Sequence, residues 1–373
     1  MKVLISGGAG FIGSNLTLAL IKRGHEVTVL DNLSPQIHTK VSPLYETIKN
    51  KVRFICGDVR SKNDWSLALE EQDVLVHLAA ETGTGQSMYE IERYVDVNIR
   101  GTAIMLDLLA NTEHSVKKII IASSRSIYGE GKYKCKEHGV IYPTGRASDS
   151  LSRGDFKVKC PHCGETSECV ATDEESKSHP SSIYGITKHN QEQMVLTTGK
   201  SLGISSIAFR YQNVYGPGQS LSNPYTGILS IFSTRIKNKN EIVIFEDGLE
   251  SRDFVYIDDV VAATILGIEN KEVIYDAFNV GSGELTDVIT VAKSLINAYG
   301  TQVQIRIAGT YRIGDIRNNY ACLEKITRVL GYKPSICFSE GIQYFSEWVN
   351  QQTVQIDNYE KSIEEMKVKG LYL

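Results

Sequence analysis

The feature that most constrains the fold is a glycine-rich loop between a predicted strand and a predicted helix. Residues 3–6 are apolar and β-prone, residues 7–13 read Gly-Gly-Ala-Gly-Phe-Ile-Gly, and an amphipathic stretch runs on to Lys22. Such a loop turns tightly, lets the backbone approach a pyrophosphate, and offers the free N–H groups of a helix N-terminus to anionic oxygens. It therefore predicts a dinucleotide-binding α/β fold. No lysine follows the last glycine, which excludes a phosphate-binding loop of the nucleoside triphosphatase type.

An acidic residue at the end of the second predicted strand indicates which dinucleotide binds. Asp31 follows the glycine loop by about 20 residues, where such folds place a carboxylate that accepts hydrogen bonds from a ribose 2′-hydroxyl. A carboxylate would repel a 2′-phosphate, so NAD is favoured over NADP. Asp58, just past the third predicted strand, is a candidate adenine contact, although an ordinary strand-end turn also explains an acid there. The glycines satisfy one spacing that begins at Gly7 and another at Gly8, and spacing alone does not choose between them.

Strand-like and helix-like segments alternate through the first half of the chain, which is typical of a parallel, doubly wound Rossmann sheet. Apolar runs predict strands at residues 3–6, 27–30, 52–55, 74–78, 119–122 and 204–209, and a helix is predicted over 182–202. Between about residues 130 and 180 the alternation stops and the chain is polar. A chain of 373 residues that is 42% hydrophobic can bury the core of two lobes. We predict an NAD-binding domain over 1–208, with an insertion at 131–179, and a mainly substrate-binding lobe over 209–373.

The composition excludes several other classes of protein. A net charge of −4 and a sequence pI near 6.1 argue against a nucleic-acid binder or a membrane-surface protein. No apolar run reaches the roughly 18 residues of a membrane span, and the first residues form a strand and a glycine turn rather than a secretory signal. The seven cysteines are odd in number and too few for a disulfide scaffold. We expect a cytoplasmic protein with no nucleic-acid or membrane partner.

Tyr184 and Lys188 lie about one turn apart at the start of the predicted helix, so the phenol and the ammonium share a face. A tyrosine that acts as a base near neutral pH needs its pKa lowered by about three units from about 10, which is roughly 4 kcal/mol. A neighbouring lysine and a positive nicotinamide ring have the charge that lowers it. Ser124 follows the strand at 119–122 and is expected at the same edge of the sheet. These residues predict a proton-transfer site beside the dinucleotide.

Six motifs follow one another along the chain. They are the glycine loop at 7–13, His-Leu-Ala-Ala at 77–80, Ser-Ser-Arg-Ser-Ile-Tyr-Gly at 123–129, the Tyr184/Lys188 pair, Arg-Tyr-Gln-Asn-Val-Tyr-Gly-Pro at 210–217, and Arg-Asp-Phe-Val-Tyr-Ile-Asp-Asp-Val at 252–260. Over about residues 1–335, apart from the insertion, the chain resembles the extended short-chain dehydrogenase/reductase family of nucleotide-sugar epimerases and dehydratases. The resemblance implies an NAD-dependent enzyme with a nucleotide-sugar substrate that works as a homodimer.

The resemblance also implies roles for individual residues. Ser124, Tyr184 and Lys188 match the catalytic hydroxyl, base and lysine of the family. Besides Tyr184 and Lys188, the positions that match cofactor contacts are Gly7, Gly10, Phe11, Ile12, Gly13, Asp31, Asn32, Asp58, Val59, Ala79, Ala80 and Asn98. The candidate substrate contacts are Ser87, Ser124, Ser126, Asn213, Arg252, Arg312 and Asp315. For each arginine the alternative role is a surface salt bridge.

One departure from the family's pattern bears on the reaction. The 4,6-dehydratases of this family carry an Asp-Glu pair directly after the catalytic hydroxyl, and these acids protonate and deprotonate the sugar. In this chain the two positions are Arg125 and Ser126. Elimination of water therefore lacks its acid and base. The sequence assigns no role to Arg125.

Two cysteine motifs in the insertion predict a metal site. Cys135 and His138 are separated by two residues, as are Cys160 and Cys163, and a glycine follows each pair. This is the spacing of two zinc knuckles, which would make one closed tetrahedral site with three sulfurs and one nitrogen. Such a zinc ion would be structural and would explain how so polar a segment folds. Cys169 or His162 could replace His138 as a ligand, and the alternative is a flexible loop with free thiols.

The motifs favour an epimerase that inverts C4 of a nucleotide-linked hexose through a transient 4-keto sugar. The segments 81–90 and 218–227 and the insertion resemble dTDP-L-rhamnose 4-epimerases more than UDP-galactose 4-epimerases. We therefore expect interconversion of dTDP-L-rhamnose and dTDP-6-deoxy-L-talose. The alternatives are a UDP-glucose/UDP-galactose-type 4-epimerase, a nucleotide-sugar oxidoreductase or decarboxylase, and, from another class, a non-catalytic NAD-sensing protein. The complete Ser124, Tyr184 and Lys188 set speaks against the last of these.

Overall fold

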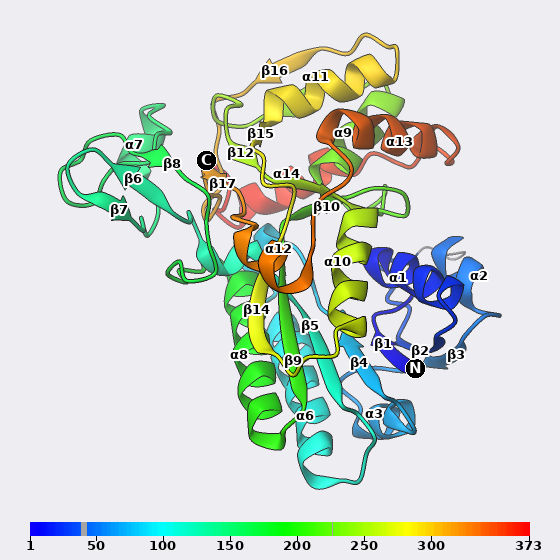
Figure 1. Ribbon diagram of the computed structural model, residues 1–373. Coiled ribbons are helices and arrows are strands. Elements are labelled where there is room, and N and C mark those ends of the chain that lie inside the picture. Colours follow the sequence, from blue (N-terminus) through cyan, green and yellow to red (C-terminus); the bar gives the residue numbers. More distant parts are fainter. Residues whose placement is uncertain (39–42, 226) are drawn as a thin grey trace.

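The computed structural model describes residues 1–38, 43–225 and 227–373, so residue 226 of the segment 218–227 lies outside the described residues. Its centre is a seven-stranded sheet in the order β14-β9-β5-β4-β1-β2-β3 (Figure 1). The strands are β1 (Lys2–Ser6), β2 (Glu26–Asp31), β3 (Arg53–Cys56), β4 (Val74–His77), β5 (Lys118–Ser124), β9 (Ser205–Tyr211) and β14 (Tyr275–Val280). Every neighbouring pair is parallel. The predicted α/β class and the six predicted strands are confirmed.

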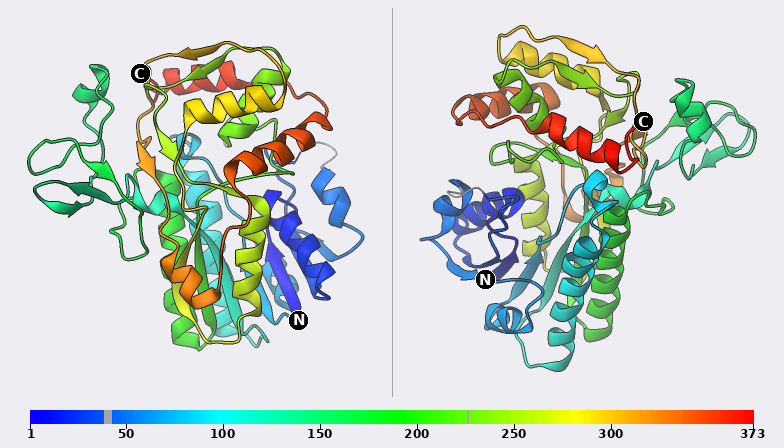
Figure 2. Two further views of the ribbon diagram at one scale, coloured as in Figure 1. Left: turned by 45° about the horizontal axis from the view of Figure 1, so that its top comes forward. Right: turned by 180° about the vertical axis from the view of Figure 1, so that it is seen from behind.

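Helices cover both faces of this sheet (Figures 1 and 2). One face carries α1 (Phe11–Lys22) and α10 (Ile257–Glu269), and the other carries α3 (Lys62–Leu69), α6 (Gly101–Asn111) and α8 (Ile183–Leu202). Each face has its own apolar core, with Leu16 and Leu20 of α1 in one and Trp65 of α3 and Val195 of α8 in the other. Strands buried on both faces are apolar throughout, which explains the continuous runs in the sequence.

The seventh strand comes from the C-terminal half of the chain. β14 pairs with β9 from Tyr275 to Val280, beyond the predicted domain boundary at residue 208. The sequence analysis missed this strand because Asp276 and Asn279 interrupt its apolar run. Since α10 also covers the sheet, residues 257–280 pack with the NAD-binding layer, and the chain does not divide cleanly at residue 208.

The remaining C-terminal elements form a smaller lobe beyond the carboxyl ends of the strands (Figure 1). They are α9 (Ile228–Lys237), β11 (Ile242–Ile244), β12 (Ser251–Arg252), β15 (Thr286–Asp287), α11 (Val288–Ala298), β16 (Ile305–Ile307), β17 (Asn318–Asn319), α13 (Phe338–Asn350) and α14 (Tyr359–Val368). β10 (Asn213–Tyr215) pairs with β13 (Phe254–Tyr256), and α12 (Glu324–Leu330) packs beside β14. In the part of the chain that is described, no helix has the length and apolarity of a membrane span.

The insertion projects from the body of the molecule as a separate small unit (Figures 1 and 2). It contains β6 (Tyr133–Cys135), β7 (Gly139–Ile141), α7 (Ser148–Ser152) and β8 (Glu168–Cys169), with β6 antiparallel to both other strands. Its own apolar cluster is small: Tyr133, Cys135, Ile141, Val158 and Cys160, with Cys163 and Cys169 packed against it. Three-stranded units of this size need a further source of stability.

Candidate active site

A cavity of about 920 Å³ lies at the carboxyl edge of the sheet, between the sheet and the C-terminal lobe. Most of the residues predicted for the site line it: Gly7, Gly10, Phe11, Ile12, Gly13, Asp31, Asn32, Val59, Ala79, Ala80, Ser124, Ser126, Tyr184, Lys188, Asn213, Arg252, Arg312 and Asp315. Asp58, Ser87 and Asn98 are not part of this lining. One continuous cavity thus contains the groups predicted for the dinucleotide and those predicted for the substrate.

The glycine loop between β1 and α1 leaves no room for side chains. Gly7 has a φ of 72°, and a Cβ there would lie 2.7 Å from the backbone nitrogen of Ala79. A Cβ on Gly13 would lie 2.3 Å from the carbonyl oxygen of Gly7. Gly8 packs against Val29 and does not line the cavity. The spacing that begins at Gly7 is therefore the one that faces the cavity.

Asp31 ends β2 beside this loop and is buried. One carboxylate oxygen accepts a 3.0 Å hydrogen bond from the backbone N–H of Ala9, and the other accepts a 2.9 Å bond from that of Leu33. These bonds fix the carboxylate at the cavity wall. His38, which the sequence analysis did not single out, lies 3.6 Å from the same carboxylate through its Nε2 atom. The geometry agrees with a carboxylate placed to receive a ribose hydroxyl.

Asp58 is engaged with protein groups rather than with the cavity. Its two oxygens accept hydrogen bonds of 2.9 and 2.8 Å from the Arg60 guanidinium, and this contact lowers the pKa of Asp58 to about 2. Asn32 donates a further bond of 3.1 Å to it. The predicted adenine contact is thus a salt-bridged turn acid, while its neighbours Gly57 and Val59 line the cavity.

Ser124 and Tyr184 meet at the centre of the cavity wall. Ser124 ends β5 and accepts a 3.1 Å hydrogen bond from the backbone N–H of Ser126, so its position is fixed by the start of the following turn. Tyr184 lies in the first turn of α8, where Ser182 caps the helix by accepting a 3.1 Å bond from Gly185. Burial raises the pKa of Tyr184, and a hydrogen bond with Ser124 and the charge of Arg125 oppose this rise.

Lys188 lies on the same face of α8, one turn after Tyr184. Burial lowers the pKa of Lys188 to about 7, and Glu192 acts in the opposite direction. Its Nζ donates a 2.7 Å hydrogen bond to Oε1 of Gln191, whose amide donates a 2.8 Å bond to Thr102. Gln191, three residues after Lys188 on the same helix, was not predicted as part of the site.

Asn98 lies behind this site in an unusual helical segment. The residues Val95–Arg100 form a π-helix, a conformation often found at functional sites. The side chain of Asn98 accepts a 2.8 Å bond from the N–H of Glu81 and donates a 2.9 Å bond to Thr187. It therefore connects the loop after β4 to α8 next to Lys188, a supporting position that agrees with the role the family resemblance implied.

Ser87 follows β4 as predicted, but its side chain does not line the cavity. The sequence analysis predicted a sugar contact, but the side chain is fully buried at the end of α4 (Thr84–Ser87). Its hydroxyl donates a 2.6 Å hydrogen bond to the carbonyl of Thr84 and accepts a 3.1 Å bond from the N–H of Tyr184. Because it is fully buried and makes these two bonds, the side chain positions the start of α8 and does not line the cavity.

Arg125 extends from the residue after Ser124 along the cavity wall. Its Nε donates a 2.9 Å hydrogen bond to Oδ1 of Asn213. Burial and the nearby charge of Arg252 lower the pKa of Arg125 to about 9, and the carboxylate of Asp315 acts in the opposite direction. At neutral pH Arg125 therefore remains a cation inside the cavity, at a position where the dehydratases carry an acid.

Two more arginines reach the cavity from the C-terminal lobe. Arg252 in β12 donates hydrogen bonds of 2.8 and 2.7 Å to the backbone carbonyls of Arg317 and Ile316. Arg312 forms a 2.8 Å ion pair with Asp315 and lies over the ring of Phe245, 5.0 Å from its centroid. Arg252 is held by backbone carbonyls, whereas Arg312 is salt-bridged to Asp315, and both guanidinium groups line the cavity, where they are suited to phosphate groups.

The last helix of the chain also lines the cavity. Tyr359, Ser362, Ile363 and Met366 of α14 contribute to its wall. The sequence analysis assigned no chemistry to this segment because it is polar and carries no motif. Its signal was the apolar spacing of Ile363 and Met366, which marks a helix face that needs a partner.

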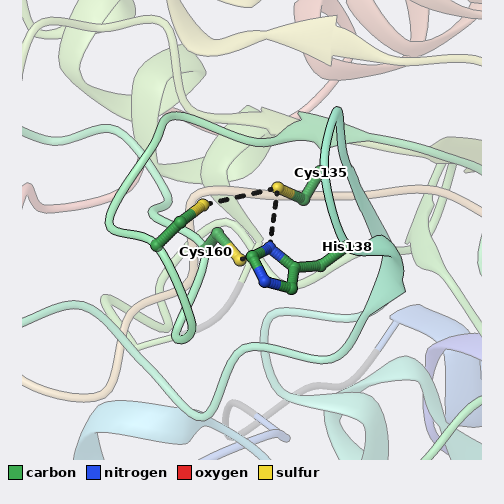
Figure 3. A group of neighbouring side chains, drawn as sticks. Cys135, His138 and Cys160 are labelled. Carbon is green, nitrogen blue, oxygen red and sulfur yellow. Dashed lines mark hydrogen bonds between the residues drawn. The ribbon is translucent and has the colours of Figure 1, made fainter.

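Four donor side chains converge in the insertion. Cys135, His138, Cys160 and Cys163 place one ligand atom each within 4.8 Å of one another. Figure 3 shows Cys135, His138 and Cys160 pointing toward a common centre, with the Cys135 sulfur 3.7 Å from Nδ1 of His138. Two sulfurs at about 2.3 Å from one zinc ion in a tetrahedron lie about 3.8 Å apart. The Cys135 and Cys163 sulfurs are 3.6 Å apart, so the set has the size that zinc requires.

The comparisons with known proteins agree with this geometry. Residues 3–145 and 161–281 match the NAD dependent epimerase/dehydratase family. A dTDP-L-rhamnose 4-epimerase of Burkholderia thailandensis is 35% identical over 94% of this chain and 95% of its own length. A putative UDP-glucose 4-epimerase of Methanocaldococcus jannaschii is 28% identical over 93% of this chain and 98% of its own.

Solved structures show the same relationship in three dimensions. The UDP-glucuronic acid 4-epimerase of Bacillus cereus, in complex with UDP-glucuronic acid and NAD, has a TM-score of 0.78 at 25% identity, over 94% of this chain and 99% of that one. The family matches, the relatives and the cavity all agree with the six motifs found in the sequence. The chain therefore belongs to the NAD dependent epimerase/dehydratase family and is an NAD-dependent nucleotide-sugar epimerase.

Proposed function

We propose that this enzyme inverts C4 of a nucleotide-linked 6-deoxyhexose and interconverts dTDP-L-rhamnose and dTDP-6-deoxy-L-talose. The observation that carries the reaction type is the placement of Ser124, Tyr184 and Lys188 along the cavity, without an acid at either position after the serine. Arg125 and Ser126 occupy these positions, so elimination of water has no acid–base pair. The site is suited to oxidising and reducing one sugar carbon.

Tyr184 and Ser124 divide the proton chemistry. The phenolate of Tyr184 accepts the proton of the C4 hydroxyl as C4 is oxidised and returns it afterwards, while Ser124 orients that hydroxyl. NAD, held by the glycine loop and Asp31, supplies the hydride acceptor and donor when it is bound. Arg252 and Arg312 hold the diphosphate while the 4-keto sugar turns its other face, so the reaction has no net redox change.

The choice of sugar rests on relationship rather than on a contact. The relative at 35% identity is a dTDP-L-rhamnose 4-epimerase, and the segments 81–90 and 218–227 resemble that group. The specific alternative is a UDP-hexose or UDP-uronate substrate, which the UDP-glucose and UDP-glucuronic acid epimerases among the relatives favour. Because an apolar pocket rejects an added hydroxyl only about a hundredfold, weak activity on UDP-hexoses is compatible with the proposal.

Parallel progress curves test this proposal. Purified enzyme is incubated at equal concentrations of dTDP-L-rhamnose, UDP-glucose and UDP-glucuronic acid, without added reductant, and the C4 configuration is followed by NMR. We expect the rhamnose derivative to equilibrate fastest. A clear preference for either uridine substrate would overturn the choice of sugar. Formation of a 4-keto sugar with stoichiometric consumption of added NAD, and no inversion of C4, would contradict the proposed reaction.

For the insertion we propose a structural zinc ion bound by Cys135, His138, Cys160 and Cys163. The spacing of the donor atoms supports this ligand set. Cys169 packs against the cluster but its sulfur faces the carbonyl of Val170 at 3.9 Å, and His162 is exposed with its ring 5.0 Å from that of His138. Neither belongs to the group of donor atoms that lie within 4.8 Å of one another, so both are weaker candidates than His138. Four protein ligands leave no open position, so the metal would stabilise and not catalyse.

We also propose that the enzyme is a homodimer that works in a reducing compartment such as the cytoplasm. None of the seven cysteines is in a disulfide, which supports the compartment. The dimer is supported by an apolar face on helices that pack together. Ile91 of α5 (Ile91–Tyr94), Val95 of the π-helix and Ile186 of α8 are 48%, 39% and 41% exposed. A surface of this kind is typical of an interface between identical subunits.

A further inference from the structure

A network centred on four buried charged side chains joins the insertion to the substrate-binding lobe, and one of them, Arg317, also pairs at 2.6 and 2.9 Å with the more exposed Asp247. Arg146 of the insertion donates a 3.1 Å hydrogen bond to Glu130 and a 2.7 Å bond to Glu246. Arg317 donates a 3.0 Å bond from its side chain to Glu246 and a 2.8 Å bond from its backbone N–H to Glu130. All four side chains are at most 8% exposed. Buried charges persist only when they are paired this completely.

Glu246, a member of this network, has an unfavourable backbone conformation. Its φ is 47°, in the left-handed region that residues with a Cβ rarely adopt. Its carboxylate lies between Arg146 and Arg317 and accepts a hydrogen bond from each. Strain that is maintained by surrounding contacts is often associated with function.

The network ends on the segment that holds a substrate-binding arginine. Arg146 donates a third bond of 2.9 Å to the carbonyl of Asp315, and Glu130 holds the N–H of Arg317. From the other side, Arg252 donates bonds to the carbonyls of Ile316 and Arg317. The three residues 315–317 are thus held between the base of the insertion and the Arg252 guanidinium, which lines the cavity.

The metal cluster is continuous with Arg146. Cys135 lies in β6, which pairs with β7, and the chain leads directly from β7 to Arg146. Loss of order around the cysteines would therefore affect Arg146, which is only a few residues away along the chain, more than it would affect the Rossmann sheet.

We propose that Arg146 is a positioning residue for the substrate: through residues 315–317 it orients Arg252 toward the nucleotide-sugar diphosphate, so the insertion tunes substrate binding without touching the substrate. The inference rests on the proposed function in one respect, which is that the ligand of Arg252 is a nucleoside diphosphate group. It does not depend on the nucleobase or on which sugar is epimerised.

Substitution of Arg146 tests this proposal by binding and kinetics. We expect Arg146→Met to raise KM and the Kd of the nucleoside diphosphates dTDP and UDP by about tenfold or more, since a charged hydrogen-bonded contact is lost. The Kd of NAD should stay within about twofold, because the glycine loop lies outside the network. Arg146→Lys retains the charge but lacks the planar guanidinium that donates to several acceptors at once. It should therefore give a smaller increase in KM and in the diphosphate Kd. Arg153→Met, exposed on the same insertion, is the matched control and should behave as wild type.

A double-mutant cycle separates positioning from general stability. If Arg146 acts through Arg252, Arg146→Met should add little to the diphosphate Kd in an Arg252→Met background. Additive effects of the two substitutions would overturn the proposal, as would an unchanged diphosphate Kd in a folded Arg146→Met or Arg146→Lys protein. If Arg146→Met fails to fold, Arg146→Lys carries the same comparison. Because dTDP and UDP are both titrated, a wrong choice of sugar leaves this result readable.

Discussion

Arg125 differs from the other cations of the site because it stands next to the reacting hydroxyls and has a neutral partner. Its Nε contacts Asn213, and its charge lowers the pKa of Tyr184 against the effect of burial. Burial lowers the pKa of Lys188 to about 7, so this side chain is only partly charged near neutral pH. Arg125, with a pKa of about 9, keeps its charge there. It is therefore the more persistent cation beside the phenol.

The charge of Arg125 predicts a change in the pH profile. Activity requires deprotonated Tyr184, so kcat/KM rises with pH through the pKa of this residue. Removal of the cation in Arg125→Ala raises the pKa of Tyr184, and the rising limb should move to higher pH. Arg125→Lys retains a charge and should move the limb less. Profiles of the three proteins from pH 5 to 10 check this, and a superimposable limb in Arg125→Ala would show that the charge does not act on the base.

Removal of the phenol gives the sharpest test of the assigned base. Tyr184→Phe keeps the ring and its packing but has no group that accepts the C4 proton, so kcat should fall by about 10²–10⁴-fold. NAD should remain bound, because the glycine loop and Asp31 are unchanged. Single-turnover kinetics and NAD titration measure the two properties. Activity within tenfold of wild type would rule out Tyr184 as the base.

Among individual residues, those within the family motifs were easier to predict from the sequence than those that hold the motif residues in place through hydrogen bonds. The order of the motifs predicted that three residues lie at the carboxyl edge of a parallel sheet, and all three line the cavity: Asp31, Ser124 and Tyr184. Ser87 was misplaced because a loop serine looks the same whether its hydroxyl faces a ligand or a backbone N–H. Gln191 was missed because its contact with Lys188 depends on a buried rotamer, which no spacing specifies.

Among the elements, those buried on both faces were predictable and those held by partners distant in sequence were not. Largely apolar runs mark β1, β2, β4, β5 and β9, so the positions of these strands follow from the sequence pattern alone. Recognition of β14, and of the role of α14 in the cavity wall, required knowledge of what covers them. β14 includes polar residues at the edge of the sheet, and α14 has an apolar face that only the cavity wall explains.

The insertion predicts a metal-dependent local fold. Its apolar cluster is too small to order three short strands alone, and two of the cluster's members are proposed ligands. We expect about one zinc ion per chain and, on chelation, loss of amide protection in residues 131–179 with the parallel sheet intact. Cys160→Ser should reproduce the effect of chelation, while the exposed Cys337→Ser should not. Hydrogen exchange and metal analysis check this, and metal content below about 0.2 equivalents in protein prepared without chelator would contradict it.

The exposed face on α5, the π-helix and α8 predicts the oligomeric state. We expect light scattering to give the mass of a dimer, and Ile186→Glu to give a monomer, because a charge would be buried at the interface. The thermal stability of the monomer should change little, since Ile186 is 41% exposed within one chain. Val273→Glu, at a position 67% exposed and away from these helices, is the control. A wild-type monomer, or a dimer that tolerates Ile186→Glu, would remove this face from consideration.

The way the chain closes the cavity has a practical consequence for handling the protein. The backbones of Tyr311 and Leu373 exchange two hydrogen bonds, of 2.8 and 3.0 Å, and Ile313 bonds to Leu371 at 3.0 Å. These bonds flank Arg312, and α14 just before them forms part of the wall. Proteolytic trimming after residue 358 during purification would therefore leave a folded sheet with its NAD site complete, but with a damaged substrate wall. Such a preparation would pass as homogeneous on a gel and be mistaken for an enzyme with weak substrate affinity, so intact mass should be verified before any KM is measured.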